Sequence, residues 1–193
     1  PNELVEMIGQ SKYIVIQIKT ESVNGAWQAC DPSTYIDALK EIISEGYKVV
    51  FAGREKMPEI FKKLGVINYS ESKNATAMND YFLVLNASGV IASVSVFSYI
   101  PDVLDIPLLT INTLFLATYP GRKTINIPSL LSKDKAPMKF KEQLEYLYDR
   151  GQITNENIVT KDINCKDASA EDILLAFKEL YIIIEKGYIS PLS

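Results

Sequence analysis

The stretch that decides the fold runs from Tyr13 to Ala52. It opens with "YIVIQI" (13–18) and, after a polar loop, continues as "DPSTYIDALKEIISEGYKVVFA" (31–52). The first run is apolar except for Gln17, which is typical of a strand buried on both faces. In the second segment Asp31-Pro32 starts a helix, apolar residues follow at helical spacing, and Gly46 ends the helix before the next apolar run. A strand, a helix and a strand in this order form a βαβ unit, which predicts a parallel sheet.

The same alternation of strands and helices continues as far as Asn112. Short apolar runs predict the strands, and helical spacing of apolar residues predicts the helices. In chain order, the further predicted elements are 58–64 (helix), 66–69 (strand), 78–85 (helix), 90–92 (strand), 99–104 (helix) and 108–111 (strand). We therefore predict an α/β fold with a Rossmann-like, doubly wound, mainly parallel sheet and additional C-terminal helices.

The whole chain, residues 1–193, is predicted to form one domain, with a core of about 12–112 and a helical C-terminal extension of about 113–193. Residues 124–139 contain two prolines and are predicted to be loop-rich. Ser169 and Asp172 form a capping-box pattern ahead of an apolar stripe, which predicts a final helix that packs against the sheet. Because the first residue is proline and not methionine, we expect a domain excised from a longer chain.

Composition and charge exclude several classes of function. The formal net charge is -4 and the basic residues are scattered, so nucleic acid is not an expected partner. No apolar run reaches about 18 residues, which predicts no membrane span, and no hydrophobic leader is seen, which favours the cytoplasm. The chain has no histidine, which excludes Ser-His-Asp and Cys-His catalysis and histidine-based zinc sites. Cys30 and Cys165 are expected to be free thiols.

Ligands of open parallel sheets bind beyond the carboxyl ends of the strands. This rule selects the loops 19–30, 53–57, 70–75 and 93–98. The last loop reads "SVSVFS", and its serines (Ser93, Ser95 and Ser98) precede a predicted helix. Free amides and the dipole at a helix start attract anions, so a phosphate or pyrophosphate is the expected guest. Alternatively, the serines only cap a helix that begins near Tyr99, for which Ser98 alone would suffice.

Two other loops carry cations to the same edge of the sheet. Lys19 and Thr20 directly follow the first strand, and Gly53 and Arg54 follow the second. Each pair is a candidate for phosphate binding: the cations supply charge, Thr20 a hydroxyl, and Gly53 a tight turn. The alternative for Lys19 and Arg54 is an ordinary solvated charge at the end of a strand.

Acidic candidates are fewer. Asp80 is either a supporting acid of the site or a first-turn acid that favours its helix. Glu21 is the only acid close to the end of the first strand and could act as a base. Neither a Walker loop nor a GxGxxG fingerprint is present, and the nearest acidic pair, Asp102 and Asp105, does not make a D-x-D metal motif. We therefore expect no metal and no cofactor.

The order of the segments "YIVIQIKT", "DPSTYIDALKEIISEGYKVVFAGRE" and "VINYSESKNATAMNDYFLVLNASGVIASVSVFSYIPDVLDIPLLTIN" resembles a family of bacterial glycosyltransferases. The resemblance covers roughly Tyr13 to Leu180. The matching half is similar to the C-terminal, nucleotide-sugar-binding domain of GT-B enzymes. The family positions that this sequence matches are Asp80, Ser93, Ser95 and Asn112, with Lys19 where the family tends to have arginine and Val96 in place of the glycine of a Ser-Gly loop.

The resemblance implies a metal-independent transferase domain that binds a nucleotide-diphosphate sugar as its substrate. The diphosphate would lie near Ser93, Ser95, Ser98 and Lys19, and an absent N-terminal domain would supply the acceptor side. No catalytic residue is identified. Because Val96 and Lys19 depart from the family, the alternative is a non-enzymatic or degenerate α/β module that binds a protein or a small ligand.

Overall fold

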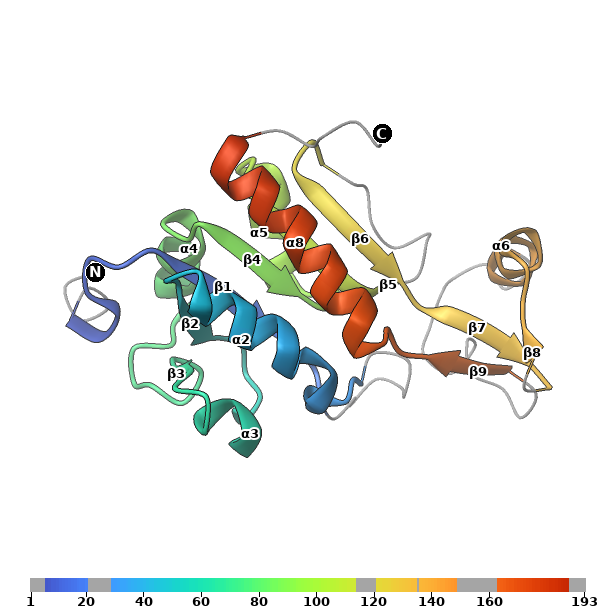
Figure 1. Cartoon of the computed structure of the whole chain (residues 1–193), viewed down its shortest axis with the longest axis horizontal. Coiled ribbons are helices and arrows are strands. Elements are labelled where there is room, and N and C mark those ends of the chain that lie inside the picture. The colour runs from blue at the N-terminus through green and yellow to red at the C-terminus, as the bar shows by residue number, and fades with distance from the viewer. Residues whose placement is uncertain (1–5, 21–28, 114–120, 135, 149–162, 188–193) are drawn as a thin grey trace.

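A six-stranded parallel sheet forms the centre of the molecule (Figure 1). The computed structural model describes residues 6–20, 29–113, 121–134, 136–148 and 163–187. The strands are β1 (Tyr13–Gln17), β2 (Lys48–Phe51), β3 (Ile67–Asn68), β4 (Gly89–Ala92), β5 (Leu108–Thr113) and β6 (Thr124–Pro128). Their spatial order is β3-β2-β1-β4-β5-β6, and every neighbouring pair is parallel. This is the strand order of a Rossmann-like doubly wound sheet, so the predicted fold class is confirmed.

Helices cover both faces of the sheet. On one face lie η2 (Pro32–Tyr35), α2 (Ile36–Ser44), α3 (Glu59–Lys62) and α8 (Ala170–Lys186). On the other face lie α4 (Ala77–Leu85) and α5 (Val96–Val103), which contact each other. In Figure 1, α2 and α8 cross in front of the sheet, and α4 and α5 lie behind it. The sheet is therefore buried between two helical layers, which explains why its central strands read as continuous apolar runs.

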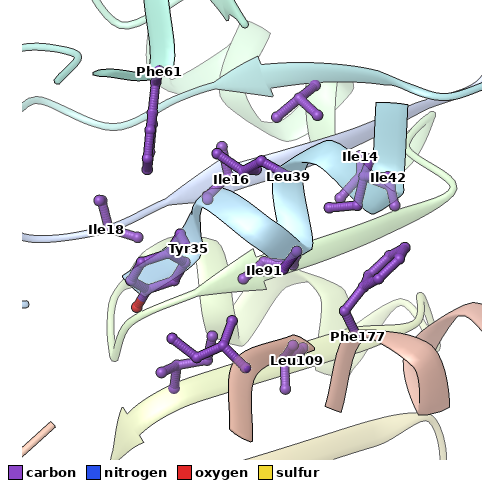
Figure 2. Close-up of a cluster of buried hydrophobic side chains, with 14 of the residues drawn as sticks. Ile14, Ile16, Ile18, Tyr35, Leu39, Ile42, Phe61, Ile91, Leu109 and Phe177 are labelled. Carbon is purple, nitrogen blue, oxygen red and sulfur yellow. The ribbon is translucent and has the colours of Figure 1, made fainter. Parts of the chain in front are cut away.

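Alternate residues of β1 enter two separate cores. Ile14 and Ile16 pack under α2 and α8, whereas Tyr13 and Val15 face α4 and α5. Figure 2 shows the first of these cores, in which Phe177 of α8 meets the strand residues. The alternation is the two-residue period of a strand, and both faces of β1 are buried because helices cover each of them.

The C-terminal region differs from its prediction. Residues 124–139 were predicted to be loop-rich, but β6 joins the main sheet, and β7 (Leu130–Lys133) and β8 (Ala136–Pro137) follow it directly. With β9 (Ile163–Lys166) the latter two form a small antiparallel sheet, order β8-β7-β9. Helix α6 (Phe140–Tyr148) places Leu147 in a third small core with β7 and β9. The prolines misled the prediction because Pro128 and Pro137 are the last residues of their strands, where proline is tolerated.

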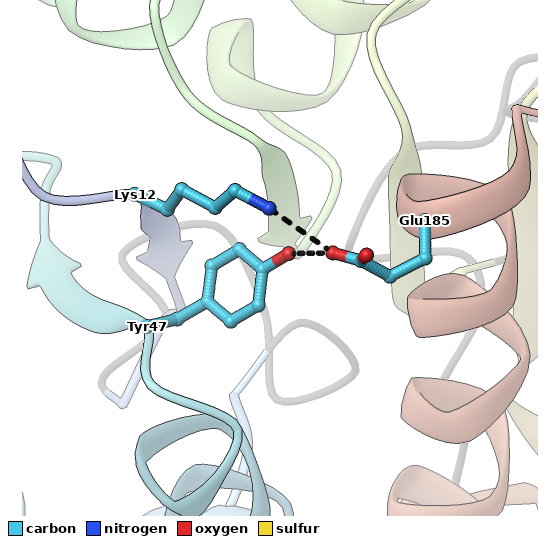
Figure 3. Close-up of polar contacts among 3 residues, drawn as sticks. All are labelled: Lys12, Tyr47 and Glu185. Carbon is cyan, nitrogen blue, oxygen red and sulfur yellow. Dashed lines mark hydrogen bonds and ion pairs between the residues drawn. The ribbon is translucent and has the colours of Figure 1, made fainter.

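Helix α8 is held at both of its ends. The predicted capping box of Ser169 and Asp172 is present at its start. Near its other end, Glu185 accepts hydrogen bonds from the Tyr47 hydroxyl (2.5 Å) and the Lys12 ammonium group (3.3 Å), as Figure 3 shows. Lys12 and Tyr47 directly precede β1 and β2, so this contact ties α8 to the amino-terminal edge of the sheet. The opposite edge is left for a ligand.

Candidate functional site

The candidate site lies at the carboxyl ends of β1 and β4, where the strand order reverses. The chain leaves β1 toward β2 on one side and leaves β4 toward β5 on the other, so this is the switch point at which the ligand crevice of a doubly wound sheet is expected. Gln17 pairs with Ala92 at the last register position, and Ser93 N donates to Gln17 O at 3.0 Å. The residues that follow these strands therefore start from one common edge.

Gln17 is the last residue of β1, beside this expected crevice. Its side chain is buried, and its Oε1 accepts a 2.6 Å hydrogen bond from Ser95 Oγ. From the β2 side Gly53 approaches so closely that a Cβ built on it would lie 3.0 Å from Gln17 Cγ, and its φ of 109° suits only glycine. Gly53 thus has a backbone conformation that requires glycine, while its part in phosphate binding stays a prediction. Sequence reasoning did not select Gln17, although a single polar residue in an otherwise apolar strand was the available signal.

The serines after β4 chiefly build the start of α5. The helix begins at Val96, so the predicted start near Tyr99 was wrong by three residues. Ser95 is the N-cap and accepts from Phe97 N at 3.2 Å, while Ser98 Oγ accepts from Ser95 N at 3.1 Å. These two serines form a capping box, in which the Ser95 hydroxyl accepts from an amide of the first turn and the Ser98 hydroxyl accepts from the Ser95 amide. The capping role that was weighed as the alternative is therefore present, but it uses Ser95 and Ser98 together.

Ser93 is the serine that the cap does not use. It is 2% exposed, and its Oγ has no hydrogen-bond partner within the described part of the chain. Buried hydroxyls are normally paired, so the unpaired Oγ keeps Ser93 a candidate for a ligand contact, and that role stays a prediction. Val94 is half-buried, whereas Val96 is exposed at the start of the helix.

Lys19 and Thr20 are joined to the loop after β2 through Glu55. The amide and hydroxyl of Thr20 both donate to Glu55 Oε2, at 2.5 and 2.9 Å. Burial lowers the pKa of the half-buried Lys19, and the nearby Glu55 carboxylate acts in the opposite direction. Cys30 N donates to Lys19 O at 2.8 Å, which closes the loop at its base. Glu55 was not selected from the sequence, and Glu21 lies outside the described residues.

Arg54 and Asp80 lie near each other at the outer side of the site. Asp80 Oδ1 accepts a 2.9 Å hydrogen bond from the buried Tyr69 hydroxyl. Burial raises the pKa of Asp80, and this hydrogen bond together with the positive charge of Arg54 opposes that shift. Asp80 is in the first turn of α4, as one of its two predicted roles requires. Its place as a supporting acid stays a prediction.

Asn112 is a predicted site residue whose side chain already has a structural partner. It has a left-handed backbone (φ 56°), is 3% exposed, and its Oδ1 accepts from Ala168 N at 2.8 Å. The side chain therefore connects the end of β5 to the segment that starts α8. Its ligand-binding role stays a prediction, and a ligand would have to bind Asn112 together with, or in place of, the Ala168 amide.

The site thus brings most of the predicted residues to one edge in three local groups. Gln17 joins Ser95 and Gly53, Glu55 joins Thr20 and Lys19, and Arg54 lies by Asp80. Within the described ranges no group of three or more Asp, Glu or Cys side chains is arranged to hold a metal ion. Among the helices described, none combines the length and the hydropathy that crossing a bilayer requires.

Comparison with known proteins shows where this fold recurs. No protein-family profile matches the sequence, and no curated protein matches it. Among solved structures, the Escherichia coli ADP-heptose lipopolysaccharide heptosyltransferase II is 13% identical, with a TM-score of 0.60 over 95% of this chain and 51% of that enzyme. A family 9 glycosyl transferase from Veillonella parvula is 13% identical, with a TM-score of 0.58 over 94% and 50%. The iron-containing dodecameric glycosyltransferase TibC from enterotoxigenic E. coli is also 13% identical, with a TM-score of 0.54 over 92% and 46%.

These similarities establish the fold. The chain has a Rossmann-like fold that recurs in GT-B glycosyltransferases, as the resemblance of its sequence predicted. It is similar in particular to heptosyltransferases and family 9 glycosyltransferases. The chain spans about half the length of these enzymes.

Proposed function

We propose that this domain binds a nucleotide-diphosphate sugar and serves as the donor half of a metal-independent GT-B glycosyltransferase. The observation that carries the proposal is the pair of strand ends at β1 and β4, where the buried Gln17 side chain and the buried, unpaired hydroxyl of Ser93 lie, in a fold shared with an ADP-heptose transferase. The proposed compartment is the cytoplasm, because Cys30 and Cys165 are both free thiols in the structure.

The start of α5 is the proposed position of the diphosphate. The helix dipole favours negative charge there, and Lys19 and Arg54 approach the same edge from the first two strands. Because the amides of Phe97 and Tyr99 already donate to Ser95, the phosphate oxygens would meet the amides of Val94 and Val96. The Ser93 hydroxyl would gain its missing partner from the same oxygens.

The nucleoside is proposed to lie toward β2. In Rossmann-like sheets an acidic residue after the second strand commonly accepts hydrogen bonds from the ribose hydroxyls. Glu55 stands at that position, and its Oε2 is already oriented by Thr20. A carboxylate held in this way accepts two further hydroxyl groups without being reoriented, which reduces the entropy lost when the nucleotide binds.

Catalysis would rest on positioning and charge. Sugar transfer breaks the bond between the anomeric carbon and the diphosphate, so negative charge builds up on the departing phosphate. The α5 dipole with Lys19 and Arg54 would stabilise that charge. The acceptor and any base that deprotonates it would come from the second domain that a GT-B enzyme has.

One observation favours a second candidate, a degenerate α/β module without transferase activity. The capping box of Ser95 and Ser98 already satisfies part of the α5 start, and Val96 places a branched side chain beside it. In such a module the same surface would bind a protein or a small ligand other than a nucleotide sugar.

Thermal unfolding in the presence of nucleotides separates the two candidates. We expect ADP, UDP, GDP or CMP, or the matching sugar nucleotide, to raise the melting temperature, since a ligand at 100 times its Kd adds about 2.7 kcal/mol of stability. Lys19→Met should weaken this shift. The matched control is Lys40→Met, because Lys40 is exposed on α2 and pairs with Asp37. If no nucleotide stabilises the domain, alone or joined to its second domain, the degenerate module is correct.

A further inference from the structure

Two apolar stripes lie on the solvent side of α4 and α5, and together they are called the α4–α5 face here. The α4 stripe follows the i, i+3, i+4, i+7 spacing, and the α5 stripe follows i, i+3, i+7. Their exposed residues are Met78, Tyr81, Phe82 and Leu85 on α4, and Val96, Tyr99 and Val103 on α5. Met78 is 65% exposed, Tyr99 54% and Val103 83%, so these side chains are not partly covered core residues.

Packing against the sheet does not explain these stripes, because each helix already buries its other side. Leu83 and Val84 of α4, and Phe97 of α5, belong to the core on this face of the sheet, and Pro101 of α5 is also buried. A surface helix normally places polar residues opposite its buried side. Here both sides carry large apolar side chains, which indicates a further layer that the described residues of one copy do not provide.

The α4–α5 face also lacks charge. Between residues 74 and 101 the sequence contains one charged residue, Asp80, which turns to the Tyr69 hydroxyl. Asp102 on α5 accepts a hydrogen bond from Thr124 at 3.0 Å and is not part of the stripe. Elsewhere in the described structure large exposed apolar side chains occur one or two to an element, such as Leu175 on α8. Such single residues are ordinary, whereas a contiguous patch indicates an interaction site.

We propose that the α4–α5 face binds a second copy of this chain across a two-fold axis. With full areas of roughly 150–250 Å² for large side chains, the seven stripe residues expose on the order of 600–700 Å². This approaches the roughly 800 Å² that each partner contributes to a standard interface. Two helices with stripes at helical spacing, paired with the same two helices of the partner, give a four-helix layer with ordinary ridge-and-groove packing.

The absence of charge supports this occupant in particular. In a two-fold contact each surface meets itself, so a charged residue near the axis faces a like charge. A face without charges avoids this repulsion. A different protein partner would instead be expected to leave some complementary charge on the surface for steering and specificity. The proposal does not rest on the proposed function. Val96 belongs to both surfaces, since its amide is placed at the diphosphate and its side chain at the end of the α5 stripe.

Sedimentation velocity over protein concentrations of about 1 to 100 µM tests the proposal. We expect a dimer of the 21.6 kDa chain that dissociates on dilution. Val103→Glu and Tyr99→Glu each place a charge at the interface and should raise the dimer Kd at least about tenfold. Both side chains are exposed, so the melting temperature of the monomer should change little.

Leu175→Glu is the matched control, because Leu175 is 54% exposed on α8, on the other face of the sheet. It should leave the dimer intact. The proposal is overturned if the chain stays monomeric over the whole range, or if the dimer survives both α4–α5 substitutions. A dimer that Leu175→Glu weakens as much as Val103→Glu would equally overturn it. Should Val103→Glu fail to fold, Tyr99→Glu decides the question.

Discussion

Replacing Gly53 by alanine should destabilise the domain through two separate effects. The φ of 109° lies outside the regions that alanine adopts, which costs about 1–3 kcal/mol. In addition, the new Cβ would lie 3.0 Å from Gln17 Cγ, so the Gln17 side chain must move. This movement strains the 2.6 Å hydrogen bond from Ser95, whose full loss would cost about 0.5–1.5 kcal/mol. Together the free energy of unfolding should fall by about 2–4 kcal/mol.

Gly46→Ala provides the control for the backbone effect. Gly46 has a φ of 85° and no atom within 4 Å of an added Cβ, so only strain of about 1–2 kcal/mol applies. Urea unfolding of both variants, with Gln17→Ala and the double variant Gln17→Ala/Gly53→Ala, forms a double-mutant cycle. We expect Gly53→Ala to be less damaging once Gln17 is shortened. If the two substitutions are additive, or if Gly53→Ala costs no more than Gly46→Ala, Gln17 is not packed against Gly53.

Three further predictions concern the contacts that hold α8. Phe177→Ala should lower the unfolding free energy by about 3–5 kcal/mol because it empties the core, whereas Leu175→Ala on the exposed side of α8 should change it by less than about 0.5 kcal/mol in the same urea titration. Asn112→Ala should cost about 1–3 kcal/mol by leaving the buried amide of Ala168 unpaired, and an unchanged melting temperature would contradict this. The hydrogen bonds from Tyr47 and Lys12 lower the pKa of Glu185, so the stability that they contribute is present above its unfolded-state pKa and is lost as the pH falls through its folded-state pKa. The Glu185→Gln variant should therefore lose less stability on acidification than the unchanged protein. Equal dependence of the unfolding free energy on pH in the two proteins would refute the contact.

The sequence was sufficient to predict strands β1 to β5 of the main sheet, because the central ones are buried on both faces. Continuous apolar runs and regular helix boundaries identify such strands without knowledge of their neighbours. Strands β7, β8 and β9 escaped prediction because they are short and β7 pairs with β9 about thirty residues later. Strand β6 escaped although it pairs in parallel with β5, because its residues are only half-buried and it ends in a proline. The prolines of β6 and β8 also suggested loops, although a proline is tolerated at the end of a strand.

The site was predicted at the level of its edge but not of its contacts. The rule for parallel sheets places the ligand beyond the strands, and it selected Ser93 and Lys19, which do follow the ends of β4 and β1; their binding role stays a prediction. It could not show that Ser95 and Ser98 cap α5, since the helix start was misplaced by three residues. Nor could it pair Glu55 with Thr20, because that contact depends on how two loops approach each other in space.

Mapping of amide chemical shifts during a nucleoside diphosphate titration tests the central claim most directly. If the crevice is the donor site, ADP, UDP or GDP should shift the amides of Gly53, Glu55 and the segment 93–97 in a saturable way. Amides of α6 and of the small antiparallel sheet should stay unchanged. Shifts that cluster on those elements instead, or the absence of saturable shifts with every nucleotide, would contradict the assignment of the crevice as a nucleotide-sugar site.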